Sequence, residues 1–229
     1  MPQPDILSQL VPHEPFDYPG VIFDFDGTIA DSMHVWAWVD REFMSRHGLV
    51  EPPDYGSKLA ELGFDQGAVY TAELFGMSES PQDIKDEWNA LAQEHYATNV
   101  FLKPGCQRYL ERLRELDTVR LAIATTLTTP LLKAALELNG ITDLFDTFVT
   151  SSIVNVAKSK PDVYLRAAEE IGRGPASCVV FEDIAPGIRS AKSVGMAAVG
   201  VYDSQSGQDL SELRDVADAV ISSFEELSR

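Results

Sequence analysis

Two aspartates stand two residues apart at the end of a short apolar run. The run is VIFDF at residues 21–25, and the segment that begins at Asp24 reads DFDGTIADS, which places Asp26 two positions later. Side chains two apart in an extended chain point to the same side, so both carboxylates face one crevice. The alternative is a plain polar turn that closes a strand, since Gly27 permits a tight turn.

A second acidic pair, Glu182 and Asp183, follows the apolar run CVVF. If the two runs are strands of one sheet, four carboxylates converge on one point, which is costly without a cation. Hard oxygen ligands favour Mg²⁺, which usually takes one or two carboxylates plus a substrate phosphate. The alternative is that the pair caps the helix that Ala185 begins, because acidic side chains suit a helix N-terminus.

Two further polar groups complete the set of candidate site residues. Thr125 follows the run RLAIA, and its hydroxyl, together with the backbone N–H groups after it, including that of Thr126, can hold phosphate oxygens. Threonine after a strand is also a common turn residue. Lys158 and Lys160 precede the helix that begins near Asp162, where an ammonium group offsets nearby anions, although most lysines are solvated surface.

Short apolar runs alternate with helical patterns along most of the chain. This alternation implies right-handed crossovers, and therefore an α/β fold with a doubly wound parallel sheet and helices on both faces. The carboxyl ends of such strands form the crevice in which ligands bind. The expected strands are 21–25, 120–124, 147–150, 178–181, 197–201 and 219–221, and the expected helices are 104–116, 129–139, 162–171 and 186–194.

One long segment breaks the alternation directly after the first strand. Residues 32–100 show helical patterns at 33–47, 58–62, 66–75 and 81–98 without a convincing strand, which predicts an inserted all-helical domain. The predicted organisation is an N-terminal tail or surface strap at 1–19, an α/β core at 20–31 and 101–229, and the helical domain at 32–100.

Composition restricts the function classes. The chain has 229 residues, of which 45% are hydrophobic, and a formal net charge of -18, which disfavours nucleic acid as a partner. No apolar run approaches the roughly 18 residues of a membrane span, and no secretory leader is evident. Two cysteines without CxxC spacing fit a reducing compartment. We therefore expect a cytoplasmic protein without membrane contact, and a monomer because no heptad seam is present.

Taken together, these segments resemble the haloacid dehalogenase superfamily, in the branch that contains β-phosphoglucomutases and small-metabolite phosphatases. The matching segments appear in the family's order: DFDGTIADS from Asp24, Thr125 after its strand, the lysine of KSKPD, and FEDIAPGI from Phe181. The resemblance covers residues 21 to about 201, and the helical insertion falls where that branch carries its cap domain.

The resemblance implies a role for each matched residue. Asp24 would be the nucleophile that forms an aspartyl-phosphate, and Asp26 would protonate the leaving oxygen and then activate water. Thr125 would orient the phosphoryl group together with the backbone of Thr126, and Lys158 would balance the negative charge. Mg²⁺ would be held by Asp24, the backbone carbonyl of Asp26 and Asp183, with Glu182 either a direct ligand or an outer partner.

The lysine segment departs from the usual family pattern K-P-x-P-D. Here it reads Lys158, Ser159, Lys160, Pro161 and Asp162, and counting back four positions from the aspartate selects Lys158. Lys160 is the competing choice.

The resemblance implies a magnesium-dependent phosphatase of a small phosphorylated metabolite, with a β-phosphoglucomutase-type mutase as the alternative. A mutase needs cations in the cap to hold a second phosphate, whereas residues 50–101 contain ten acids and two bases, a net charge of 2 - 10 = -8. The mutase also has a cap histidine twelve residues beyond its nucleophile, where this chain has Trp36, although His34 is close by. A dehalogenase proper, which attacks carbon, and a non-enzymatic phosphate-accepting module fit Asp26 less well.

Aromatic residues in the inserted domain offer one further hypothesis. Met33, Trp36, Trp38 and residues 62–70 are candidates for an apolar wall around the non-phosphate part of a substrate. The alternative is ordinary packing of the helices on one another.

Overall fold

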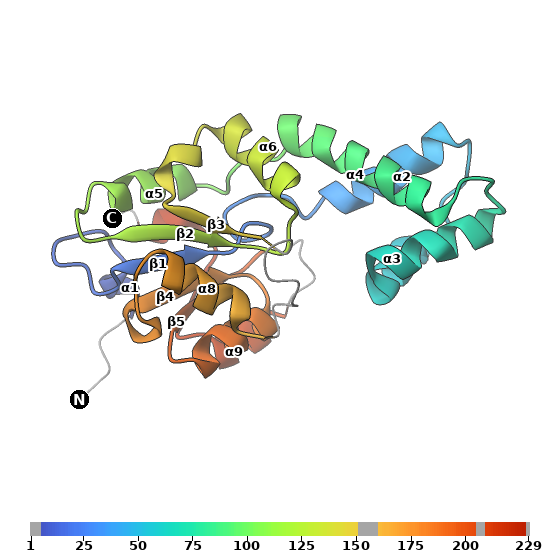
Figure 1. Cartoon of the computed structure of the whole chain (residues 1–229). Coiled ribbons are helices and arrows are strands. Elements are labelled where there is room, and N and C mark those ends of the chain that lie inside the picture. Colours follow the sequence, from blue (N-terminus) through green and yellow to red (C-terminus); the bar gives the residue numbers. More distant parts are fainter. Residues whose placement is uncertain (1–5, 151–159, 205–208, 228–229) are drawn as a thin grey trace. The chain divides into compact units, whose positions relative to one another are not determined.

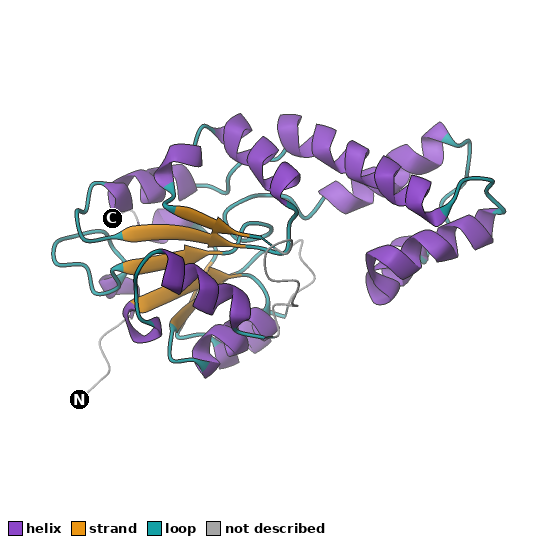
Figure 2. Ribbon diagram, viewed as in Figure 1, coloured by secondary structure: helices purple, strands orange, loops and turns teal. Residues whose placement is uncertain are grey.

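The computed structural model describes residues 6–150, 160–204 and 209–227. The chain divides into two compact units, Met1–Met33 with Phe101–Arg229, and His34–Val100. Figures 1 and 2 show a parallel sheet with helices in the first unit and helices alone in the second. No described helix is both long and apolar enough to cross a membrane.

The first unit is built on a six-stranded sheet in the order β3-β2-β1-β4-β5-β6. All neighbouring strands are parallel. This order is the doubly wound arrangement, and β1 and β4 flank the point at which the chain reverses direction across the sheet. The predicted α/β fold is therefore confirmed. The strands are β1 Gly20–Phe23, β2 Arg120–Ala124, β3 Thr147–Val149, β4 Cys178–Glu182, β5 Ala197–Val201 and β6 Ala219–Ile221.

Alternating side chains of the strands build two separate core layers. Ile22 lies in a buried cluster with Tyr164 and Ile188, on the face covered by α8 and α9. Its neighbour Phe23 points the other way and stacks on Phe181 with ring centroids 4.9 Å apart. Both faces of β1 are thus buried, as a central parallel strand requires. The helices of this unit are α1 Ile6–Gln9, α5 Cys106–Arg114, α6 Thr129–Asn139, α8 Asp162–Glu170, α9 Ala185–Ser193 and α10 Leu210–Val216.

The segment before β1 is attached to this core. Leu10 and Phe16 are buried. The hydroxyl of Tyr109 in α5 donates to the carbonyl oxygen of Leu10 at 3.0 Å, and Arg112 donates to the carbonyl oxygen of Pro12 at 3.2 Å. The described part of this segment therefore packs on α5.

The second unit contains three helices: α2 Val35–Arg46, α3 Tyr55–Phe75 and α4 Pro81–Thr98. Helices α2 and α3 each pack against α4. The start of α4 is fixed by a capping box between Ser80 and Asp83, with proline at the first helical position. The two helices predicted at 58–62 and 66–75 are one continuous helix, because the chain remains helical through residues 63–65.

Candidate active site

The loop after β1 is folded tightly enough to fix Asp24. The Asp24 N–H donates to the carbonyl oxygen of Phe181 in the neighbouring β4 at 2.9 Å. The carbonyl oxygen of Phe25 then accepts from the N–H groups of Thr28, Ile29 and Ala30 at 3.3, 3.1 and 3.0 Å. The Thr28 hydroxyl donates to Asp24 Oδ2 at 3.3 Å. Asp24 is thus held directly at the end of β1.

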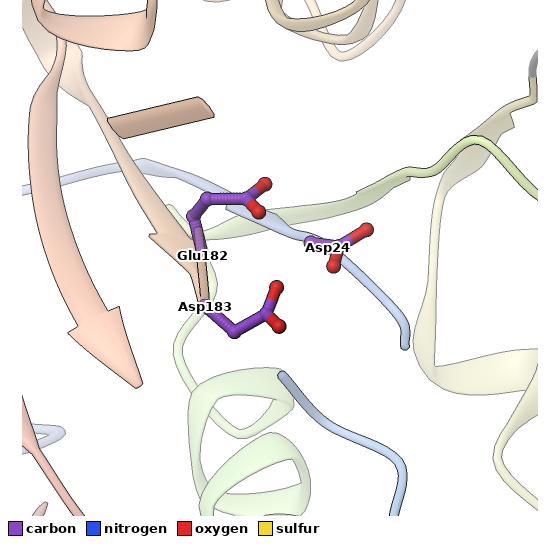
Figure 3. A group of neighbouring side chains, drawn as sticks. All are labelled: Asp24, Glu182 and Asp183. Atoms are coloured by element: carbon purple, nitrogen blue, oxygen red, sulfur yellow. The ribbon is translucent and has the colours of Figure 1, made fainter. Parts of the chain in front are cut away.

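Three carboxylates meet between β1 and β4. Asp24, Glu182 and Asp183 each offer a carboxylate oxygen, and these oxygens lie within 4.8 Å of one another. Figure 3 shows Asp24 after β1 and the other two at the end of β4, with their carboxylates turned toward a common space. All three residues are buried, and none is more than 4% exposed. The sequence predicted that four carboxylates converge, and the described residues bring three of them together, since Asp26 is not in this group.

This donor set suits a hard divalent cation. Three negative charges in one buried space repel one another and lose their hydration, so a cation stabilises them. The donors are carboxylate oxygens, which Mg²⁺ and Ca²⁺ prefer. The residues present therefore fit a divalent metal ion.

Glu182 is oriented by two hydrogen bonds. The Tyr164 hydroxyl donates to Glu182 Oε2 at 2.8 Å, and the Ile184 N–H donates to Oε1 at 3.3 Å. Burial, and then the charge of Glu182, raises the pKa of Tyr164 above its ordinary range, so the hydroxyl keeps the proton that it donates. A Cβ on Gly187 would lie 2.7 Å from both the Glu182 carboxyl carbon and the Tyr164 oxygen, so a side chain at this position would displace one of these two groups.

Gly27 makes room for Asp183 in the same way. Its φ of 71° lies in the left-handed region. A Cβ at this position would overlap Asp183 Oδ2. The sequence assigned Gly27 only to a tight turn, and the structure adds that the absence of a side chain allows Asp183 to approach the loop after β1.

The acidic pair touches the start of α9 but lies with Asp24. Helix α9 begins after Ile184, whose own side chain makes no capping hydrogen bond, and the Ile184 N–H donates to Glu182 Oε1 at 3.3 Å. Glu182 is the last residue of β4, and Asp183 follows it with its carboxylate near that of Asp24.

Thr125 follows β2 at the same edge of the sheet. Its N–H donates to the carbonyl oxygen of Val149 at 3.0 Å, and its hydroxyl oxygen accepts from the Leu127 N–H at 3.2 Å. Residue Ile123 pairs with Phe23, which places Thr125 beside the loop that carries Asp24. Thr125 is buried and Thr126 is exposed.

The structure says less about the three remaining predicted residues, Asp26, Lys158 and Lys160. Asp26 is half-buried and lies in a short parallel bridge with Ala30. Lys158 lies outside the described residues. Lys160 is described and exposed, so the choice between the two lysines stays a prediction.

Tyr164 is the site residue that the sequence did not identify. It lies in α8, 18 positions before its partner Glu182. The spacing within a helical pattern predicts a buried face, but it does not reveal which buried aromatic carries its hydroxyl to a strand end. In the same way, the sequence did not show that Gly27 lies against Asp183 or that Gly187 lies against Glu182.

Comparison with known proteins identifies the relatives of this chain. Residues 18–195 match the family model of the haloacid dehalogenase-like hydrolases. Protein CbbY of Rhodobacter capsulatus is 32% identical over 189 residues, which make up 78% of this chain and 83% of that protein. Fructose-1-phosphate phosphatase YqaB of Escherichia coli is 32% identical over 194 residues, 80% of this chain and 96% of that enzyme. The crystal structure of a candidate β-phosphoglucomutase from Thermotoga maritima has a TM-score of 0.79 and 25% identity, covering 91% of this chain and 95% of its own.

Proposed function

Because the chain belongs to the haloacid dehalogenase-like hydrolases, we propose that it is a magnesium-dependent phosphatase of small phosphomonoesters. The observation that carries this proposal is the buried group of Asp24, Glu182 and Asp183 at the point where the chain reverses across the sheet. The similarity to a fructose-1-phosphate phosphatase supports a phosphorylated sugar as the substrate class.

The first half-reaction transfers the phosphoryl group to Asp24. A carboxylate oxygen of Asp24 forms a bond to phosphorus while the bond from phosphorus to the leaving oxygen breaks. Asp26, protonated at this stage, gives its proton to that oxygen, so a neutral alcohol departs. The loop that fixes Asp24 through Phe181 and Thr28 holds the nucleophile in place for this attack.

The second half-reaction returns the enzyme to its starting state. Asp26, now ionised, accepts a proton from water as the water oxygen bonds to phosphorus. The bond between phosphorus and Asp24 breaks, which releases inorganic phosphate and restores the carboxylate. Asp26 ends protonated, ready for another cycle.

The other predicted residues bind the phosphoryl group and the metal. The Thr125 hydroxyl and the backbone N–H of Thr126 donate to phosphoryl oxygens, and Lys158 offsets their charge. Asp24, the backbone carbonyl of Asp26 and Asp183 would hold Mg²⁺, which when bound neutralises charge on the transferring group.

We assign Glu182 to orienting the metal site rather than to direct coordination. Both of its oxygens already accept hydrogen bonds, from Tyr164 and Ile184. A carboxylate held in this way fixes the groups that surround a metal ion.

A mutase is the second candidate, because the similar Thermotoga maritima structure is a candidate β-phosphoglucomutase. The net charge of -8 over residues 50–101 opposes this alternative, since a bisphosphate needs cations on both sides. The single most useful test measures phosphate release from a panel of sugar phosphates with Mg²⁺ or EDTA. β-Glucose 1-phosphate with its bisphosphate activator is included, and glucose 6-phosphate is assayed.

Each outcome of this test has a clear meaning. Magnesium-dependent phosphate release that is lost in Asp24→Asn supports the phosphatase. Formation of glucose 6-phosphate without phosphate release supports the mutase. Absence of any turnover across the panel would favour the non-enzymatic alternative.

The lysine assignment is tested with a matched pair of variants. We expect Lys158→Ala to lower kcat by at least tenfold and Lys160→Ala to leave it nearly unchanged. The reverse result would assign the role to Lys160. A cytoplasmic monomer stays a prediction from the sequence.

A further inference from the structure

The His34–Val100 unit contains a pocket of its own among α2, α3 and α4. Its volume is about 230 Å³, and it is lined chiefly by Trp36, Asp40, Leu59, Phe64 and Trp88. We call it the aromatic pocket. If one water molecule takes about 30 Å³, the pocket has room for about seven waters, or for a small organic group.

Three aromatic rings form a chain along this pocket. Trp36 and Phe64 meet edge to face with centroids 5.7 Å apart, and Phe64 meets Trp88 in the same manner at 5.6 Å. Trp88 is 3% exposed, whereas Trp36 and Phe64 are 40% and 39% exposed. The buried ring therefore belongs to the interior of the pocket, and the two exposed rings belong to its mouth.

Asp40 is the one charged side chain among the described lining residues. It is only 8% exposed, and no hydrogen bond or ion pair reaches its carboxylate from the described part of the chain. A Cβ on Gly56 would lie 3.7 Å from Asp40 Oδ2, so the carboxylate stands against a position without a side chain. The Asp40 oxygens are not among the fully buried atoms without a partner, so they keep a small contact with solvent. A carboxylate that is this far withdrawn from water is still destabilised, which makes it a receptor for a cation or for a proton.

The charges around Asp40 do not supply that cation. Burial, and then the charge of Glu51, raises the pKa of Asp40 to about 6, and Arg41 opposes this rise only in part. Burial, and to a smaller extent the charge of Asp40, raises the pKa of Tyr55. The Tyr55 hydroxyl is hydrogen-bonded to the Thr71 hydroxyl at 2.7 Å and not to Asp40. At neutral pH most Asp40 carboxylates are thus ionised and face an apolar space.

We propose that the aromatic pocket binds an organic ammonium cation, with its charge toward Asp40 and its alkyl groups against Trp36, Phe64 and Trp88. Aromatic rings attract cations through their quadrupoles, most strongly when tryptophan contributes. An ammonium group also supplies the opposite charge that Asp40 lacks. This proposal concerns the His34–Val100 unit alone and does not depend on the phosphatase activity.

A sugar would fit these lining residues poorly. Each hydroxyl that enters a pocket must regain the hydrogen bonds that it made to water. Apart from Asp40 and the indole N–H groups of Trp36 and Trp88, the side chains of the described lining residues offer no hydrogen-bonding group, because the others are Leu59, Phe64, Gly56 and Gly67. Trp88 Nε1 is buried without a hydrogen-bond partner in the described part of the chain, so a sugar would find one or two donors and one carboxylate for its several hydroxyls. The pocket therefore favours a ligand whose polarity is concentrated in one positive charge.

Tryptophan fluorescence can follow binding directly. The chain has three tryptophans, Trp36, Trp38 and Trp88, and all of them belong to this unit. We would titrate the full chain with choline, with the uncharged isostere in which carbon replaces the choline nitrogen, and with glucose. We expect choline to bind at least tenfold more tightly than the isostere, and glucose to give no saturable change.

Choline affinity measured in two variants and at several pH values shows whether the pocket recognises the charge of the ligand or only buries its apolar surface. Asp40→Asn keeps the shape of the side chain and should weaken choline binding about tenfold, to the level of the isostere. Asp86→Asn, an exposed acid on α4, should leave binding unchanged. In the wild type, choline affinity should fall about tenfold from about pH 8 to about pH 5, as Asp40 takes up a proton, and Asp40→Asn should lose this dependence.

Three results would overturn the proposal. The first is an absence of saturable choline binding to the wild type. The second is equal affinity for choline and for its uncharged isostere. The third is a choline affinity that is the same in Asp40→Asn as in the wild type, or that does not change with pH in the wild type.

Discussion

Asp40 should make the protein less stable as pH rises. Its pKa is raised from 3.8 to about 6 by burial. Below pH 3.8 the carboxyl is protonated in both the folded and the unfolded chain and has no effect. Between 3.8 and about 6 the unfolded chain releases its proton first, so ionisation favours unfolding, and the full penalty is present above about 6. The rise of the Asp40 pKa from 3.8 to about 6 corresponds to at most about 3 kcal/mol, because the carboxylate oxygens keep some contact with water.

The assay compares the wild type with Asp40→Asn in urea unfolding followed by tryptophan fluorescence. Asparagine carries no charge, but its buried amide has a cost of its own at every pH. The informative quantity is therefore the change with pH in the stability difference between the two proteins. We expect Asp40→Asn to gain about 1.4 kcal/mol relative to the wild type between about pH 5 and about pH 8, and Asp86→Asn to gain nothing. A stability difference that stays constant with pH would refute the reasoning, because it would mean that the Asp40 carboxylate is not desolvated.

Two further substitutions test the site on the sheet. Gly27→Ala should push Asp183 aside and raise the Mg²⁺ concentration needed for half-maximal activity at least tenfold, as measured by a metal titration. Gly140→Ala is its control, because φ is 64° there and no described atom lies within 4 Å of the added Cβ. It should lower stability by about 1 kcal/mol and leave the metal titration unchanged, and equal behaviour of the two variants would contradict the argument. Tyr164→Phe removes the hydrogen bond to Glu182 and should raise the Mg²⁺ concentration needed for half-maximal activity about tenfold. An unaltered metal titration would exclude this role of Tyr164.

The strands and the convergence of carboxylates could be predicted because both follow from local pattern. Each apolar run is short, is bounded by polar or turn residues, and alternates with a helical pattern, which permits few topologies. Asp24, Glu182 and Asp183 directly follow or end two of these runs, and parallel strands end at one edge. Their meeting is therefore a consequence of chain topology and does not depend on the details of packing.

The features that the sequence did not reveal depend on contacts between distant side chains. Tyr164 reaches Glu182 only because α8 packs on the sheet with a particular rotation, which a helical period alone does not fix. The left-handed turn at Gly27 was foreseen, but its closeness to Asp183 was not. Asp40 lies in an ordinary amphipathic helix, and its burial without a partner follows from the packing of α2 and α3 on α4.

The long helix α3 shows a different limit. The segment 63–65, which contains a glycine and an aspartate, indicates a break between two short helices. The structure continues the helix from Tyr55 to Phe75, where a left-handed Gly76 ends it. Packing of α3 against α4 outweighs a local propensity cost of about 1 kcal/mol.

The central claim is that Asp24 carries the phosphoryl group during turnover. The most direct measurement uses Asp26→Asn, which lacks the acid and base needed to release the adduct, with p-nitrophenyl phosphate, whose leaving group departs without protonation. Intact-protein mass spectrometry after acid quenching should show a protein heavier by one phosphoryl group, with the modification located on Asp24 and absent from the Asp24→Asn variant. The account would be contradicted if the wild type turns over p-nitrophenyl phosphate but Asp26→Asn shows no such adduct, or if the adduct lies on another residue.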